Sequence, residues 1–114
     1  MEFENLSSTD VMDWSAVNGT CLQGYVDASY EDLKACFGQH CQGDKHRTDA
    51  EWVLKFDNGT VATIYNYKDG KAYLGEDGLA VKDIRDWHVG GRSSYAIDLV
   101  NYVLEAFYAR TLAA

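Results

Sequence analysis

Four side chains of the kinds that bind zinc lie close together in the middle of the chain. Cys36, His40, Cys41 and His46 supply thiols and imidazoles, the donors that a tetrahedral zinc ion takes. Their spacing lacks the paired C-x-x-C arrangement of a zinc knuckle, and the helical pattern around Cys36 turns that residue toward the core. We therefore expect a buried cysteine beside a polar loop, and neither a metal ion nor another cofactor.

Three carboxylates in and after the same loop are candidates for a divalent cation. Asp44, Asp49 and Glu51 match no calcium-loop pattern, and Lys45 and Arg47 interrupt them. We expect these acids to lie on a solvated surface.

His88 is the candidate for acid–base chemistry. It precedes Gly90-Gly91 and the expected start of a helix, and Arg92 follows, an arrangement that suits contact with an anion. A small hydrolase or nuclease would use His88 with an Asp. No Ser or Cys nucleophile with a defined partner accompanies it, so we assign no catalytic residue. We favour a protein that is not an enzyme and keep the His88-dependent hydrolase or nuclease as a second alternative function.

Basic and aromatic side chains indicate an alternative function, the binding or sequestering of a nucleotide-like signal. Positive charge attracts the phosphates of such a ligand, and aromatic rings stack on its bases. The residues expected to contribute are Lys45, His46, Arg47, Trp52, Tyr65, His88 and Arg92.

Negative charge is concentrated at the start of the chain. Seven acids precede the first base, Lys34, and from there on eleven acids oppose ten bases, so the first 33 residues carry most of the net charge of -8. A field of this sign repels nucleic acid and attracts basic surfaces, so we expect no direct DNA binding. The face expected to bind a basic partner comprises Asp10, Asp13, Trp14, Asp27, Tyr30, Glu31 and Asp32.

The 114 residues suit a single domain with its own core, since 46% of them are hydrophobic. No apolar run reaches the ~18 residues that span a membrane, and residues 1–10 lack the pattern of a secretory signal. We therefore expect a protein without a membrane segment, whose cysteines stay reduced. Residues 1–13 form either a mobile acidic arm or a docked strand or helix. The aromatic excess and the hairpin edges also suit a twofold homodimer.

The sequence pattern predicts helices and strands that would position these residues in an α+β fold. We expect an antiparallel sheet of about four strands, one short helix and a longer C-terminal helix packed on the sheet. A strand covers about Cys21 to Val26, and a helix covers about Tyr30 to Phe37, capped by Ser29 and stopped by Gly38.

The central hairpin joins Ala50–Asp57 to Thr60–Tyr67 through Asn58-Gly59. A two-residue turn there predicts a register in which Phe56 faces Val61, Leu54 faces Thr63 and Trp52 faces Tyr65. We expect that face to meet the core.

Glycines mark the expected turns and element ends in the second half of the chain. Residues 69–79 form either a long loop or a small hairpin around Ala72–Leu74. A strand ends at Val89, where Gly90-Gly91 breaks it, and Ser93 or Ser94 caps the final helix. The apolar positions of that helix are Ala96, Leu99, Val100, Val103, Leu104 and Phe107.

Three pieces of the chain resemble a group of small bacteriophage-encoded proteins of unknown function. The pieces are YEDLKACFG, GDKHRTDAEWVLKFDNGTVATIYNYKDGK and DWHVGG, within Tyr30 to Gly91. The resemblance implies a phage origin and action in the cytoplasm of an infected bacterium. Together with the acidic first third, it leads us to expect an inhibitor of a host defence system. The kind expected is an anti-CRISPR-type DNA mimic, which binds the basic surface of a CRISPR effector or another nucleic-acid-binding defence protein.

Overall fold

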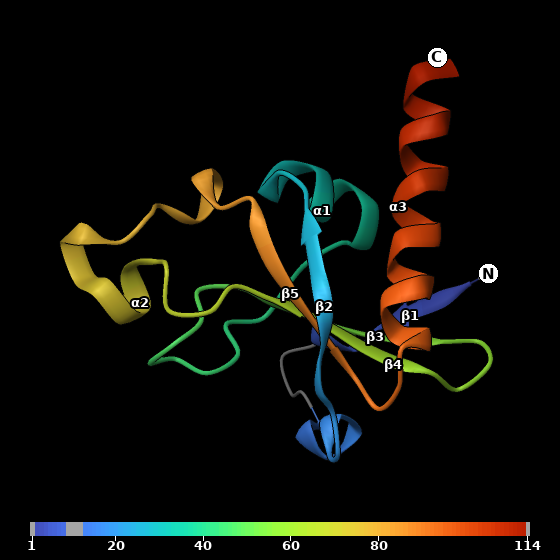
Figure 1. Cartoon of the computed structure of the whole chain (residues 1–114), viewed down its shortest axis with the longest axis horizontal. Coiled ribbons are helices and arrows are strands. Elements are labelled where there is room, and N and C mark those ends of the chain that lie inside the picture. The colour runs from blue at the N-terminus through green and yellow to red at the C-terminus, as the bar shows by residue number, and fades with distance from the viewer. Residues whose placement is uncertain (1, 9–12, 114) are drawn as a thin grey trace.

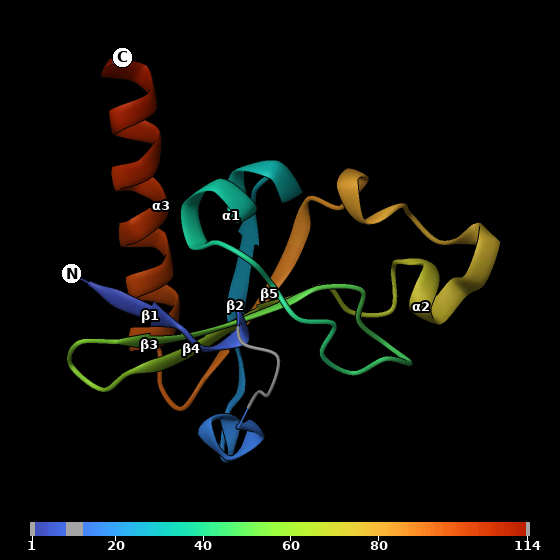
Figure 2. The ribbon, with the colours of Figure 1, turned by 180° about the vertical axis from the view of Figure 1, so that it is seen from behind.

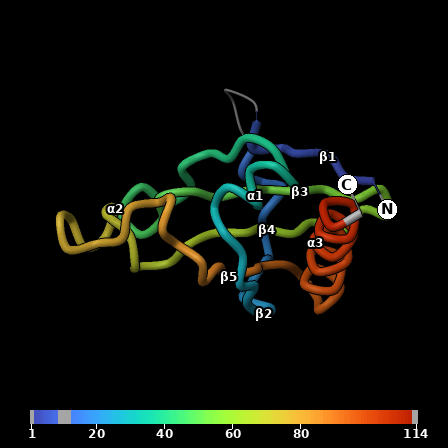
Figure 3. The backbone as a smooth tube through the Cα atoms, turned by 90° about the horizontal axis from the view of Figure 1, so that it is seen from above, coloured from blue at the N-terminus to red at the C-terminus, as the bar shows by residue number. Residues whose placement is uncertain are grey.

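One antiparallel sheet of five strands organises the structure, a computed structural model that describes residues 2–8 and 13–113. The strands are β1 (Phe3–Asn5), β2 (Cys21–Asp27), β3 (Glu51–Phe56), β4 (Val61–Tyr65) and β5 (Asp86–Gly91). They succeed one another in the order β1-β3-β4-β5-β2, with β4 at the centre (Figure 3). The expected α+β class is confirmed, with one strand more than the four predicted.

Helices α1 (Tyr30–Phe37) and α3 (Tyr95–Ala113) pack on one face of this sheet and enclose the core with it. The two helices lie on the same side in both ribbon views (Figures 1 and 2). Core side chains come from alternate strand positions, such as Trp52 and Leu54 of β3 and Ala62 and Ile64 of β4. The other face, called the open face below, carries no long helix among the described residues.

Helix α1 has the predicted bounds. The Ser29 side chain accepts a hydrogen bond from the Asp32 amide and so caps the first turn, while Gly38 ends the helix at φ +95°. Leu33 and Phe37 are buried, as their spacing predicts. The final helix is also confirmed, with Ala96, Val100, Val103 and Leu104 buried.

Strand β1 resolves the alternatives for most of the N-terminal segment in favour of a docked strand. Its Phe3 ring packs against the rings of Phe37 and Phe56, with centroids 5.5 and 5.8 Å away. The Asn5 side-chain amide donates hydrogen bonds to the carbonyls of Phe37, the last residue of α1, and of Gln39, two residues further on. Residues 3–8 are therefore held by contacts distant in sequence, while residues 9–12 lie outside the described part of the chain.

The predicted hairpin exists, but its register is wrong by one residue. Phe56 pairs with Thr60 across the turn, so three residues form the loop instead of two. Gly59 takes φ +87°, the left-handed conformation that such three-residue loops use. Trp52 consequently faces Ile64 rather than Tyr65. Because side chains alternate between faces, this shift moves Tyr65 and Thr63 from the core to the open face.

Two expectations for the glycine-rich second half are also corrected. Residues 69–79 form neither hairpin nor plain loop, because a one-turn helix, α2 (Lys71–Leu74), continues into the 3-10 turn η3 (Gly75–Asp77). Gly90 and Gly91 do not end β5 but belong to it. A Cβ on Gly90 would strike the Thr63 hydroxyl, and one on Gly91 would strike Ala96, so glycine here permits close packing on both faces.

Asn66, which follows β4, is fully buried and holds the start of β3 to the segment before α2. Its carbonyl oxygen accepts hydrogen bonds from the amides of Asp49 and Ala50, at 2.7 and 3.1 Å. Its amide group donates to the carboxylates of Asp49 and Asp69, both at 3.0 Å. The network connects three segments that no strand pairing joins at this point.

Asn66→Ala should lower the free energy of unfolding by about 3 kcal/mol, because the substitution leaves two backbone amides without an acceptor in a buried place. Urea unfolding followed by tryptophan fluorescence measures the loss. Asn101→Ala, at an exposed position of α3, is the matched control and should change the stability by less than about 0.5 kcal/mol. Equal effects of the two substitutions would contradict a structural role for the network.

Candidate functional site

Four side chains form a straight row across the open face of the sheet. The strand registers place Glu51 opposite Tyr65, Tyr65 opposite His88, and His88 opposite Tyr25. The row therefore crosses β3, β4, β5 and β2 in turn. The His88 ring stacks on Tyr65 at 15° and 5.4 Å, and meets the Tyr25 ring edge-on at 4.9 Å. The central sheet thus presents a line of rings that ends in a carboxyl group.

A pocket of about 210 Å³ lies beside this row, and we call it the open-face pocket. Glu51 and Tyr65 belong to both the row and the pocket. Thr63 and Gly90, neighbours on β4 and β5, lie in the next row of the sheet. Gly90 has no side chain, and a Cβ there would strike the Thr63 hydroxyl, so only glycine fits at this place in the lining. The complete lining is Val17, Thr20, Cys21, Asp44, Arg47, Thr48, Glu51, Thr63, Tyr65, Tyr67 and Gly90.

The loop before β3 supplies one side of the pocket and is held by its own hydrogen bonds. The Thr48 hydroxyl donates to the carbonyls of Gln42 and Asp44. The Asp44 carboxylate accepts from the His46 amide at 2.9 Å and from the Arg47 guanidinium at 2.8 Å. These bonds lower the pKa of Asp44, with the His46 amide as the largest cause. Arg47 therefore reaches the pocket with its charge already paired.

Glu51 is the unusual ionisable group of the pocket. Burial, and secondarily the negative charge of Asp44, raises the pKa of its carboxyl group to about 7. No hydrogen bond from another described side chain reaches this carboxyl group. The sequence predicted a solvated surface for Glu51, and this is wrong because the loop before β3 folds over it: a Cβ on Gly43 would strike its carboxyl oxygen. Asp44, as expected, remains exposed.

The hydroxyl of Tyr65 shares this environment. Burial raises the pKa of Tyr65, and the charge of Glu51 raises it further. His88, whose ring stacks on Tyr65, has its Nδ1 atom buried without a hydrogen-bond partner among the described residues. Within residues 2–8 and 13–113, no carboxylate hydrogen-bonds to His88. The Asp partner that a His88-dependent hydrolase requires is therefore not supplied by the described residues.

The structure brings together only part of the expected ligand-binding set. Arg47 and Tyr65 line the pocket, and His88 stacks behind Tyr65. Trp52 is fully buried in the core, where its indole donates to the Gly38 carbonyl at 2.7 Å, so stacking of a ligand on Trp52 is excluded. Arg92 is engaged with the carbonyls of Asn18 and Ala16. The remaining two members, Lys45 and His46, are exposed on the loop before β3.

The acidic set expected to form one face is divided by β2. Asp13 and Trp14 lie at η2 (Trp14–Val17), before the strand, whereas Asp27 ends the strand and Glu31 follows it in α1. Figure 1 shows α1 and the start of β2 at opposite ends of the strand. The strand is seven residues long, which separates the two groups by roughly 20 Å. Asp10 lies outside the described residues.

Two further members of the acidic set are engaged internally. The Tyr30 ring packs against Trp52 and Trp87 and hydrogen-bonds to His40, so it is not a free anchor. The Asp32 carboxylate accepts a 2.9 Å hydrogen bond from Tyr108 of α3. The expectation of a single acidic face therefore needs correction, because the length of β2 separates Asp13 and Trp14 from Asp27 and Glu31.

The Cys and His residues of the sequence cluster have separate partners. His40 contacts Tyr30, and the Cys41 thiol donates to the Glu51 carbonyl at 3.3 Å. Burial raises the pKa of Cys36 to about 11. Within the described ranges, no three His, Cys, Asp or Glu side chains are placed to hold a metal ion.

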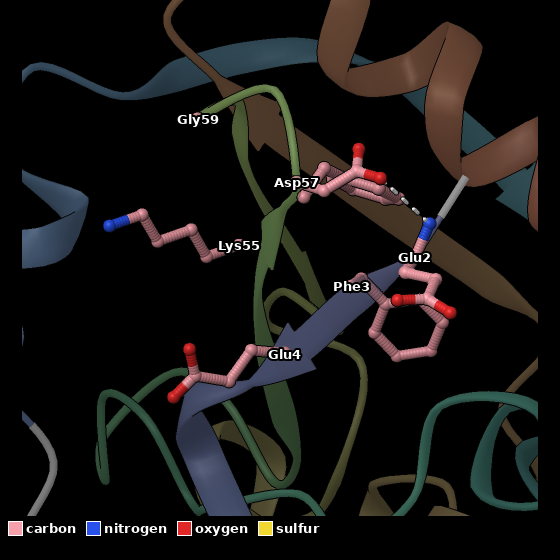
Figure 4. A pocket seen from close by; sticks show the side chains of 7 residues that line it. Glu2, Phe3, Glu4, Lys55, Asp57 and Gly59 are labelled. Atoms are coloured by element: carbon pink, nitrogen blue, oxygen red, sulfur yellow. Dashed lines mark hydrogen bonds between the residues drawn. The ribbon is translucent and has the colours of Figure 1, made fainter.

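A larger hollow of about 410 Å³ lies where β1 meets the β3–β4 turn (Figure 4). Glu2, Glu4 and Asp57 line it together with Lys55, and all four are exposed to solvent. The Asp57 carboxylate accepts a 3.4 Å hydrogen bond from the Glu2 amide. Water competes fully with a ligand among exposed charges, so we regard the smaller open-face pocket as the better candidate site.

Comparison with known proteins finds no family model that matches this chain, and no curated protein or solved structure that matches it. What the pocket can bind must therefore follow from its residues. None of the helices in the described part of the chain is long and apolar enough to cross a bilayer.

Sequence reasoning placed Glu51 on a solvated surface and did not identify Cys21 as a site residue. The signal for Glu51 was the alternation of β3, which places it on the face opposite Trp52. With the three-residue hairpin loop, the same alternation would have placed Tyr65 beside it. Cys21 carried no such signal, because its neighbour Gly91 was expected to lie outside any strand.

Glu51→Gln should remove a pH dependence of folding stability. The folded protein keeps the Glu51 proton up to about pH 7, whereas the unfolded chain loses it near pH 4.5. The free energy of unfolding should therefore fall as the pH rises through this interval, by about 2 kcal/mol from this group. Urea unfolding at pH 5 and pH 8 measures the difference.

The Gln variant should lack this decrease, and Glu105→Gln, at an exposed position of α3, should retain it. A decrease of equal size in both variants would show that Glu51 does not titrate in the folded protein between these pH values.

Proposed function

We propose that this protein is a binding protein that captures a small, nucleotide-like ligand in the open-face pocket. The observation that carries the proposal is the convergence of four segments there: the end of η2 with the start of β2, the loop before β3, the strand β4 with Tyr67, and Gly90 of β5. Residues distant in sequence thus meet at one open pocket. Such sites are the usual location of small-ligand binding.

The size of the pocket limits the ligand. About 210 Å³ is less than the ~300–1,000 Å³ of pockets that enclose a drug-sized molecule. One flat ring system fits, with the rest of the molecule outside. A nucleobase has this shape, and its sugar and phosphate would extend toward solvent, where the exposed Lys45 and His46 belong to the same loop as Arg47.

The lining supplies both interactions that a nucleobase uses. Tyr67 is 42% exposed and Tyr65 is half-buried, so both rings have surface left for stacking. Glu51, Thr63 and Arg47 provide polar atoms at the edge of the same space. Capture without chemistry is favoured because no nucleophile with a base accompanies these groups among the described residues.

The resemblance to small phage proteins gives the capture a biological setting. Nucleotide-like molecules serve as signals, and a protein that binds such a signal without turning it over lowers its free concentration. We propose that the protein acts in this way in the cytoplasm of an infected bacterium, as an inhibitor of a host defence system.

Nucleotide binding should raise the melting temperature and protect Cys21, an exposed thiol in the pocket. Thermal-shift measurements against ribonucleoside monophosphates and cyclic dinucleotides, and alkylation of Cys21 followed by mass spectrometry, test this directly. Tyr67→Ala should weaken binding about tenfold through the loss of about 1.4 kcal/mol of stacking.

Tyr102→Ala is the matched control, since Tyr102 is exposed on α3 and takes no part in the pocket. It should bind as the wild type does. If no nucleotide shifts the melting temperature or slows alkylation of Cys21, the proposed function is wrong.

A second candidate function is binding to a basic protein surface, as expected from the sequence. The register places Asp27 directly opposite Asp86 at the ends of β2 and β5. Like charges in this position destabilise a sheet, and only Arg85 forms an ion pair with either of them in the described structure, at 3.0 Å from Asp27. Glu31 of α1 is exposed at the same end of β2. This smaller acidic end suits the basic surface of a CRISPR effector or another defence protein.

Charge reversal tests this candidate with a matched control. The Asp27→Lys, Glu31→Lys, Asp86→Lys triple variant should lose inhibition of a CRISPR nuclease in a DNA-cleavage assay. The Glu76→Lys, Asp77→Lys, Asp98→Lys variant has the same net charge at other exposed positions and should retain it. Equal behaviour of the two variants would contradict an acidic binding end.

A further inference from the structure

We infer that the open-face pocket selects a guanine-type ring edge, in which a ring N–H and an exocyclic amino group lie side by side, through the carboxylate of Glu51. This inference rests on the proposed function and names the ligand class of the same site. A carboxylate offers two acceptor oxygens and, when ionised, no donor. Among nucleobases, only the guanine edge presents two adjacent donors to such a pair of acceptors.

The nearby groups of Arg47 and Thr48 already have hydrogen-bond partners within the protein, whereas the Glu51 carboxylate remains as an acceptor for a ligand. Arg47 is paired with Asp44 at 2.8 Å, and the Thr48 hydroxyl donates to two backbone carbonyls. Glu51 has no such partner among the described side chains. A ligand edge that donates two hydrogen bonds would therefore meet two acceptor oxygens that no described side chain already occupies.

The charge balance of the pocket supports a donor edge. Asp44 and Arg47 cancel each other, so an ionised Glu51 leaves one negative charge. Adenine and cytosine edges place an acceptor beside their amino group, and uracil places two carbonyls around its N–H. Each would bring a lone pair toward the carboxylate, whereas guanine brings none. Charge-assisted hydrogen bonds are about twice as strong as neutral ones.

Ionisation of Glu51 adds a pH signature to this recognition. Its pKa of about 7 in the free protein means that the carboxylate form increases between pH 6 and pH 8. Guanosine affinity should rise up to about tenfold across this range. The charged and titratable groups that face Glu51 or share its pocket are Asp44 and Arg47 of the loop, Cys41 opposite it in a β-bridge, Tyr65 and Tyr67 at and after β4, and Cys21 of β2.

Isothermal titration of the full chain with guanosine, inosine, adenosine and cytidine tests the inference. Guanosine should bind most tightly, and inosine, which lacks the exocyclic amino group, about tenfold more weakly. Glu51→Gln should reduce the guanosine affinity about tenfold and abolish its rise with pH, since an amide offers one donor and one acceptor. Glu105→Gln, on the outer side of α3, should change neither.

The possible results distinguish a failure of the guanine inference from a failure of the proposed nucleotide-binding function. If nucleosides bind and protect Cys21 but guanosine has no preference, or Glu51→Gln keeps that preference, the guanine edge is wrong and the binding site stands. If none of the four nucleosides binds the wild-type protein at pH 8, the guanine edge is wrong. The proposed function fails with it only if no nucleotide raises the melting temperature either. Circular dichroism of Glu51→Gln confirms that a loss of affinity is not a loss of folding.

Discussion

The pairing of β4 with β3 on one side and β5 on the other is the constraint on which the structure depends. Because strand side chains alternate, this one register decides that Ala62 and Ile64 enter the core and that Thr63 and Tyr65 face outward. It also aligns Tyr65 with Glu51 and His88 across three strands. A slip of one residue would exchange the core and the site. Both therefore have the same physical origin.

In the open-face pocket, the packing of the loop before β3 buries a carboxyl group whose ionisation that burial disfavours. Glu51 is held where burial and the nearby Asp44 oppose its ionisation. Proteins commonly place such destabilised groups where a ligand compensates them. The loop that creates this burial is fixed by the Thr48 and Asp44 hydrogen bonds and by Asn66, which holds Asp49 and Ala50 next to it. The hydrogen bonds that hold this loop thus also keep the Glu51 carboxyl group buried.

Local patterns predicted those elements whose causes are local. Helix α1 has its expected bounds because its cap, its apolar spacing and its glycine stop all lie within ten residues. The hairpin was expected at the right place, yet its loop length was wrong because an Asn-Gly pair serves both two- and three-residue loops. Strand β1 was left open because Phe3 and Asn5 are held by residues far along the chain.

The sequence by itself determined the class of fold, the positions of the two main helices and the central hairpin, since these follow from short-range periodicity and capping. Tertiary structure alone decided which charges act together. It separated Asp13 from Asp27 along β2, buried Trp52, and folded the loop before β3 over Glu51. The physical reason is that electrostatic and binding properties depend on distance and burial in space, which residue order does not contain when the contacts join distant segments.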